Sequence, residues 1–117
     1  MKTILVVDDE PDIRESVKMV LEKKGYRIIT AVDGDDCLHR LHEETPDLIL
    51  LDIMMPGIPV KEVIQKIEGI KIAFLSVVRT SEAERQDLLQ QKNIVAFIRK
   101  PFSTDELLKI VKKTLGE

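Results

Sequence analysis

The chain alternates between short, uninterrupted apolar runs and longer stretches in which apolar residues recur every three or four positions. The first pattern is typical of β-strands buried on both faces, and the second of amphipathic helices. Together they predict five strands, at residues 3–7, 26–31, 48–51, 72–75 and 94–98. They also predict five helices, at about residues 11–24, 37–43, 59–68, 81–91 and 104–115.

Local signals place the ends of several of these helices. Pro11 suits the first turn of a helix, where its missing N–H costs nothing, and Gly25 predicts the end of the first helix. The pair Asp33-Gly34 predicts a turn before the second helix. The last two helices begin with the Ser-x-x-Glu spacing of a capping box, at Ser81 with Glu84 and at Ser103 with Glu106.

Strands and helices that alternate strictly indicate a parallel sheet with helices on both faces, joined by right-handed crossovers. The most apolar strands should lie at the centre of the sheet, and these are residues 4–7, 48–51 and 72–75. Arg27 and Thr30 indicate that the second strand lies at an edge. We therefore expect an α/β fold whose five-stranded parallel sheet has the order 2-1-3-4-5, with a ligand cleft between the first and third strands.

Composition narrows the classes of function. A chain of 117 residues suffices for a real core, and we expect a single domain over residues 1–117 with no output domain. The net charge of −3 argues against a nucleic-acid partner. No apolar run approaches the roughly 20 residues of a membrane span. Cys37 is the only cysteine, so no internal disulfide can form; without a recognisable signal peptide, this predicts a cytoplasmic protein.

Acidic residues follow two of the central strands. Asp8 and Asp9 follow the first strand, and Asp52 follows the third. The carboxyl ends of parallel strands share one edge of a sheet, so these side chains should lie close together. Neighbouring carboxylates repel one another, and a divalent cation removes that cost. The oxygen ligands favour Mg²⁺, with Mn²⁺ as an alternative, because Mg²⁺ prefers one or two carboxylates together with a phosphate.

Two more side chains at this edge suit a phosphoryl group. Lys100, after the fifth strand, offers a compact positive charge, and Ser76, after the fourth, offers a hydroxyl. Asp52 is the best candidate nucleophile because its strand is central, which leaves Asp8 and Asp9 to hold metal. Taken singly, each residue also has a structural interpretation, such as a helix N-terminus or a solvated surface. Their joint appearance, each at a strand end, favours phosphoryl transfer onto a carboxylate.

These strand ends resemble the motifs of the receiver domain of two-component response regulators. The matching residues are Val6-Val7-Asp8-Asp9-Glu10, Leu51-Asp52-Ile53-Met54-Met55-Pro56-Gly57, Ser76 and Lys100-Pro101-Phe102. The resemblance covers essentially the whole chain and implies a flavodoxin-like (βα)5 three-layer sandwich. It also implies a signalling phosphoprotein, not an enzyme, which promotes only its own phosphorylation and dephosphorylation.

The resemblance gives each site residue a role. It implies that Asp52 is the phosphoacceptor for a histidine kinase or phosphotransfer protein. Asp9, Asp52 and the backbone carbonyl of Met54 would bind Mg²⁺, and Asp8 would act through a water. Lys100 would pair with Asp52 and then with its phosphate, and the Lys100–Pro101 peptide bond would be cis.

A switch is also implied by the resemblance. Ser76 would move toward the new phosphoryl group, and Phe97, three residues before Lys100, would turn into the space that it leaves. Plain core packing is the alternative for Phe97. The fourth helix, fifth strand and last helix would then present a changed face to an unidentified downstream protein, or to a second copy in a phosphorylation-linked homodimer.

Three features depart from the family pattern. Pro59-Val60 stands where an Asp-Gly pair is usual, and the segment from Asp52 to Ser76 is several residues short, which predicts a trimmed third helix. Val77 stands where a small residue is usual, and its larger side chain would narrow the path to Asp52. Val77 supports the alternative of a degenerate receiver that acts as a phosphate-independent interaction module.

Two other functions fit the fold less well. A Mg²⁺-dependent phosphohydrolase with an aspartyl nucleophile needs a second acid where this chain has Met54. A flavin-binding protein needs a phosphate-cradling loop after the first strand. We therefore expect a stand-alone receiver. Its kinase should dock on the first helix and on the loop after the fifth strand, at Ile13, Arg14, Val17 and Pro101-Phe102.

Overall fold

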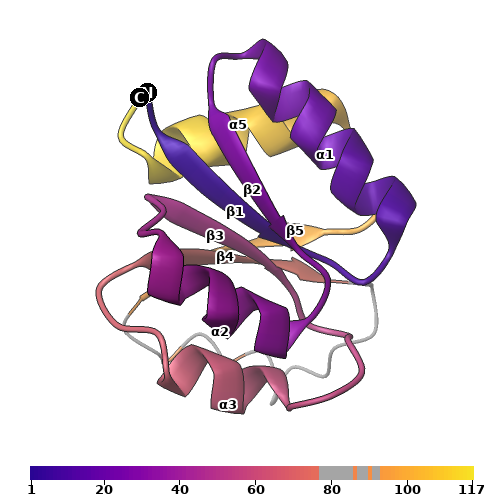
Figure 1. Ribbon diagram of the computed structural model, residues 1–117. Helices are drawn as coiled ribbons and strands as arrows, with labels where there is room; N and C mark the ends of the chain where they lie inside the picture. The colour runs from indigo at the N-terminus through magenta and orange to yellow at the C-terminus, as the bar shows by residue number, and fades with distance from the viewer. Residues whose placement is uncertain (77–85, 87–89, 91–92) are drawn as a thin grey trace.

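The computed structural model describes residues 1–76, 86, 90 and 93–117, and it confirms the predicted α/β fold (Figure 1). Five parallel strands form one sheet in the order β2-β1-β3-β4-β5. The strands are β1 (Thr3–Val7), β2 (Arg27–Ala31), β3 (Leu48–Asp52), β4 (Lys71–Ser76) and β5 (Ile94–Arg99). The helices with described bounds are α1 (Pro11–Lys23), α2 (Gly34–Glu43), α3 (Val60–Gln65) and α5 (Thr104–Thr114). Val77 and most of the helix predicted at 81–91 lie outside the described residues.

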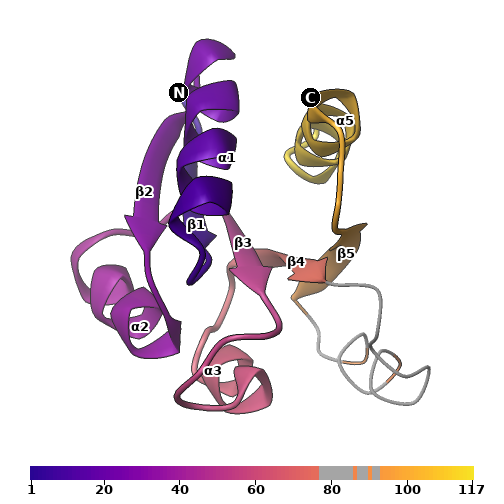
Figure 2. The same cartoon turned by 90° about the vertical axis from the view of Figure 1, so that its right-hand side faces the viewer.

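Helices cover the sheet on both sides, with α1 and α5 on one face and α2 and α3 on the other (Figure 2). Each central strand therefore contributes alternate side chains to two cores. In β3, Leu48 and Leu50 pack with α1 and α5, whereas Ile49 and Leu51 pack with α2 and α3. All five residues of β3 are buried, as the uninterrupted apolar run predicted. Packing on both faces therefore holds β3, which ends at Asp52, in place.

Two helix boundaries differ from those predicted. The turn predicted at Asp33-Gly34 is wrong, because Asp33 is the N-cap of α2 and its side chain accepts a hydrogen bond from the Asp36 N–H at 2.8 Å. Gly34 is already helical. α3 is shorter than predicted because its hydrogen bonding changes at the C-terminal end. There the Lys66 N–H donates to the Val63 carbonyl, three residues back, at 3.1 Å, which is the tighter spacing of a 3₁₀ turn.

A bulge interrupts the pairing of β5 with β4. Ile72 pairs with Ile94 and Ala73 with Ala96, so Val95 has no partner in the register. The extra residue lets Ile94 and Phe97 face the same core, beside α2 and α3. It thereby sets the direction in which the end of β5 presents its side chains.

The two chain ends lie near the start of β2. The Arg27 N–H donates to the carbonyl of Lys2 at 2.9 Å, and the hydroxyl of Tyr26 donates to Glu117 at 2.5 Å. Burial, and then the hydrogen bond to Glu117, raise the pKa of Tyr26 to about 12. In the described part of the chain, no helix has the length and apolar character needed to cross a membrane.

Candidate functional site

The predicted acidic cluster forms at the carboxyl ends of β1 and β3. Ligand atoms of Asp8, Asp9 and Asp52 all lie within 4.8 Å of one another. Asp8 is fully buried and Asp52 is 2% exposed, whereas Asp9 is exposed. Two of the three carboxylates, those of Asp8 and Asp52, are therefore shielded from water, and the third, that of Asp9, is exposed to solvent.

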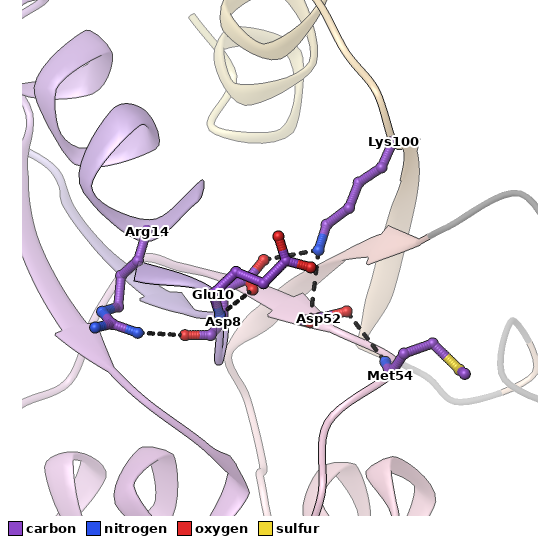
Figure 3. A network of polar contacts seen from close by, with 6 residues as sticks. All are labelled: Asp8, Glu10, Arg14, Asp52, Met54 and Lys100. Atoms are coloured by element: carbon purple, nitrogen blue, oxygen red, sulfur yellow. Dashed lines mark hydrogen bonds and ion pairs between the residues drawn. The ribbon is translucent and has the colours of Figure 1, made fainter. Parts of the chain in front are cut away.

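Lys100 reaches this cluster from the residue after β5 (Figure 3). Its Nζ donates to Asp8 Oδ2 at 2.8 Å and lies 3.5 Å from Asp52 Oδ2. Burial favours the neutral amine, but the hydrogen bond to Asp8 and the charges of Asp52 and Asp8 outweigh it, so the pKa of Lys100 is raised. The ammonium is therefore held charged. The Lys100–Pro101 peptide bond is cis.

The Asp52 carboxylate lies between this ammonium and the loop that follows β3. Its Oδ1 accepts a hydrogen bond from the Met54 N–H at 3.0 Å, and its Oδ2 faces Lys100. Burial raises the pKa of Asp52 to about 6, with the charges of Asp8 and Asp9 adding to it. The Met54 N–H and Lys100 act in the opposite direction and do not cancel the rise. Asp52 is thus a carboxylate whose ionisation costs more than usual.

The donor set fits a small, hard divalent cation. Three carboxylates converge, and oxygen is the ligand that Mg²⁺ prefers. The Asp9 carboxylate makes no hydrogen bond or ion pair with any residue that the structure describes. A cation would also offset the repulsion that helps to raise the pKa of Asp52.

The loop between β1 and α1 holds Asp8 through both its side chain and its backbone. Asp8 Oδ1 accepts from the Glu10 N–H at 2.9 Å, and the Asp8 carbonyl accepts from Arg14 Nη1 at 2.7 Å (Figure 3). Sequence reasoning missed both contacts. A signal for the first existed, since an Asp often accepts from the N–H two residues on. No signal identifies the second, in which a helix side chain reaches a carbonyl six residues back.

The predicted docking residues on α1 need a correction. Val17 is only 2% exposed and packs in the core beneath α1 and α5, so it cannot form part of a docking surface. Ile13 packs partly against the same core, and Arg14 is engaged with Asp8. The recurrence of apolar residues every three or four positions already indicated that Val17 lies on the buried face of α1, so its inclusion in the docking surface was wrong.

The two predicted switch residues lie on β4 and β5. Ser76 is the last residue of β4 and pairs with Arg99, and its side chain lies outside the described part of the structure. Phe97 pairs with Phe74, and the two ring centroids lie 5.1 Å apart at a tilt of 55°. Phe97 is partly buried, so plain core packing accounts for the ring as the structure shows it.

A family model described as the response regulator receiver domain matches residues 4–112. The chain belongs to the response regulator receiver family. Receivers serve two-component signalling, in which they bind Mg²⁺ at an acidic pocket and interact with histidine kinases or phosphotransfer proteins. The family is a signalling family and not one of classical enzymes.

Individual relatives agree with this assignment. The chain is 38% identical over 116 residues to the alkaline phosphatase synthesis transcriptional regulatory protein PhoP of Bacillus subtilis. That match covers 97% of this receiver and 48% of PhoP, so the chain spans about half the length of this curated relative.

Solved structures give the same result. The response regulator TrrA from Thermotoga maritima, in complex with Mg²⁺–BeF, is 41% identical, with a TM-score of 0.80 over 97% of this chain and 99% of that one. A receiver domain protein from Methanospirillum hungatei is 32% identical, with a TM-score of 0.86 over 97% and 94% of the two chains.

Proposed function

We propose that this receiver accepts a phosphoryl group on Asp52 from the phosphohistidine of a histidine kinase or phosphotransfer protein. The position of the Asp52 carboxylate carries the proposal. It ends the central strand β3, with Lys100 Nζ 3.5 Å from Oδ2 and ligand atoms of Asp8 and Asp9 within 4.8 Å. An Asp52 oxygen bonds to phosphorus while the P–N bond to histidine breaks, and the imidazole nitrogen keeps the electron pair. The product is an acyl phosphate on Asp52.

The surrounding residues position and neutralise charge, which is most of what phosphoryl transfer requires. Asp9, Asp52 and the Met54 carbonyl would hold Mg²⁺ or Mn²⁺, with Asp8 acting through a water. The metal, when bound, supplies charge neutralisation and orients the phosphoryl oxygens. Lys100 contacts Asp52 first and then a phosphoryl oxygen. The complex of the Thermotoga relative with Mg²⁺–BeF supports this assignment.

Phosphorylation would signal by changing the surface that the receiver presents to its partners. Ser76 turns toward the phosphoryl group, and Phe97 follows into the space that it leaves. The face formed by β5, α5 and the segment between β4 and β5 then binds a downstream protein or a second copy of the receiver. We place this activity in the cytoplasm, and we propose that the receiver itself makes no nucleic-acid contact. The Bacillus relative, a transcriptional regulator, is about twice as long as this chain.

The experiment is intact-protein mass spectrometry after incubation with acetyl phosphate, with and without Mg²⁺. The wild type should gain the mass of one phosphoryl group only with Mg²⁺. Asp52→Asn should gain none, whereas Asp35→Asn, which alters an exposed acid in the first turn of α2, should behave as wild type. A phosphoryl gain on Asp52→Asn would contradict the assignment of the acceptor.

The degenerate receiver remains the alternative, and Val77 is its support. Absence of any adduct on a folded wild-type chain would favour it. Val77→Ala is then the decisive variant, because restored phosphorylation would identify the valine as the obstruction. For the proposed change of surface, size-exclusion chromatography of the phosphorylated chain should show a dimer that the unmodified chain does not form.

A further inference from the structure

We propose that Arg14 is a positioning residue for the metal site: its guanidinium fixes the peptide that joins Asp8 to Asp9, and so directs the Asp9 carboxylate into the acidic cluster. The inference rests on the proposed Mg²⁺-dependent function. It assigns Arg14 to the machinery of the site, where the sequence had suggested only a place in kinase docking.

The contact is short and crosses from a helix to a loop. Arg14 Nη1 donates to the Asp8 carbonyl at 2.7 Å, and the side chain is partly buried. Arg14 is itself anchored, because its backbone N–H donates to the Glu10 carbonyl at 3.0 Å in the first turn of α1. The guanidinium therefore holds the Asp8 carbonyl, which immediately precedes Asp9, at a fixed position relative to α1.

Asp9 depends on this anchor more than its neighbours do. The Asp8 carboxylate is held by Lys100 and by the Glu10 N–H, and the Asp52 carboxylate is held by the Met54 N–H. The Asp9 side chain has no such partner among the residues that the structure describes. Its direction therefore follows from its backbone. The Asp8 carbonyl and the Asp9 N–H belong to one planar peptide, so fixing that oxygen fixes the start of Asp9.

Little else restrains the turn into α1. Pro11 opens the helix without an N–H, and the N-cap residue Glu10 makes no side-chain capping bond. The Asp8 N–H donates to the Ala31 carbonyl at 3.2 Å. Beyond that point, among the residues that the structure describes, the turn is held by the bond from the Glu10 N–H to Asp8 Oδ1 at 2.9 Å, which leaves the Asp8 carbonyl free to rotate. Arg14 supplies the second point of attachment. With both bonds in place, the two peptides on either side of Asp9 are each held by one hydrogen bond, so the backbone of Asp9 has less freedom to rotate than with one bond alone.

Charge and geometry predict opposite effects when Arg14 is removed. A cation near three carboxylates repels Mg²⁺, so loss of its charge alone would tighten metal binding. Loss of the positioning bond would instead weaken it, because Asp9 would no longer be held in place as a ligand. The sign of the change in Mg²⁺ affinity therefore separates the two roles.

The test is isothermal titration of Mg²⁺ into folded wild-type, Arg14→Met, Arg14→Lys and Lys18→Met chains. We expect Arg14→Met to weaken binding about tenfold, as loss of a residue that orients a metal ligand commonly does. Arg14→Lys keeps the charge but lacks the planar fork, and it should fall between wild type and Arg14→Met. Lys18→Met removes a charge one turn further along α1 and should leave the affinity unchanged. Equal or tighter binding by Arg14→Met overturns the inference.

A second readout needs no metal. Amide hydrogen exchange at Glu10 should be faster in Arg14→Met than in wild type, because the turn loses one of its two attachments. If Arg14→Met does not fold, Arg14→Lys decides alone, and wild-type affinity in that variant overturns the inference.

The outcomes also separate this inference from the proposed function. Phosphorylation by acetyl phosphate should slow in Arg14→Met at low Mg²⁺ and recover at saturating Mg²⁺, which a docking role does not predict, since that donor needs no kinase. A wild type that is phosphorylated on Asp52 while Arg14→Met binds Mg²⁺ equally well refutes only the role of Arg14. A wild type that binds no Mg²⁺ refutes both.

Discussion

Lys100 forms its hydrogen bond with Asp8 rather than with Asp52. Its Nζ is 2.8 Å from Asp8 Oδ2 and 3.5 Å from Asp52 Oδ2. The resemblance to receivers had implied a pairing with Asp52, and the ammonium in fact bridges both acids. One buried cation thus balances two buried carboxylates, which makes Lys100 a competitor of any metal that binds there.

Lys100→Met tests this competition. The variant keeps an unbranched side chain one atom shorter and removes the charge, so Mg²⁺ should bind about tenfold more tightly, in line with the roughly 1.5–3 kcal/mol of a charge-assisted hydrogen bond. Transfer of the phosphoryl group should slow at the same time, since its oxygens lose a counter-ion. Titration calorimetry measures the first effect and mass spectrometry the second. Lys109→Met, on the exposed surface of α5, is the control and should change neither. Unchanged Mg²⁺ affinity in Lys100→Met would contradict the competition.

The raised pKa of Asp52 predicts a dependence of stability on pH. The folded pKa of about 6 lies above the usual value of 3.8, so between these values the folded state holds a proton that the unfolded state has lost. Stability from this group is therefore lost as pH rises from about 4 to 6. Asp52→Asn removes the penalty and should raise the free energy of unfolding at pH 7.5 by on the order of 3 kcal/mol.

Urea denaturation at several pH values without metal measures this difference. The gain of Asp52→Asn over wild type should vanish below pH 4 and should shrink when Mg²⁺ is added, because the cation stabilises the ionised site. Asp35→Asn provides the exposed comparison. A constant difference at all pH values would indicate that Asp52 titrates normally.

Gly34 marks a close approach between α2 and the segment that leads into α3. A Cβ at this position would lie 2.7 Å from Val63 Cγ2 and 3.1 Å from Ile58 Cγ1. Gly34→Ala should therefore lower the free energy of unfolding by about 1–3 kcal/mol, the usual cost of overpacking. The double variant Gly34→Ala with Val63→Ala should lose less than the sum of the two single variants, because removal of Val63 Cγ2 makes room. Strict additivity in this cycle would rule out the clash.

Cys37 offers a probe of global unfolding. Its thiol is fully buried, and burial together with the charge of Asp36 raises its pKa to about 12. A disulfide reagent such as DTNB should therefore fail to label the native protein at pH 8. Labelling should increase with urea in proportion to the unfolded fraction. Cys37→Ala gives the blank, and rapid labelling without denaturant would show that α2 opens locally.

The sequence predicted the strands and their order because each strand has a simple apolar pattern. The apolar run before Asp52 favoured a strand covered on both faces, and the strand order then predicted that Asp8, Asp52 and Lys100 lie at one edge of the sheet. The choice of partner within that cluster was not predictable. Whether Lys100 bonds to Asp8 or Asp52 depends on differences of less than 1 Å, which are set by packing. The burial of Val17 could have been predicted from the apolar spacing of α1. The start of α2 was missed because Asp33 was interpreted as a turn residue, whereas its side chain caps the helix.

The contacts of Lys2 and Glu117 with the start of β2 place both termini at the edge of the sheet away from the carboxyl ends of its strands. A bead, surface or fluorescent fusion attached at either terminus therefore leaves the acidic pocket facing open solvent. A biosensor built on this scaffold could be immobilised by either end without blocking access of a phosphodonor. Because both ends also reach the same strand, a short peptide could join them and let the chain be opened at an exposed loop instead.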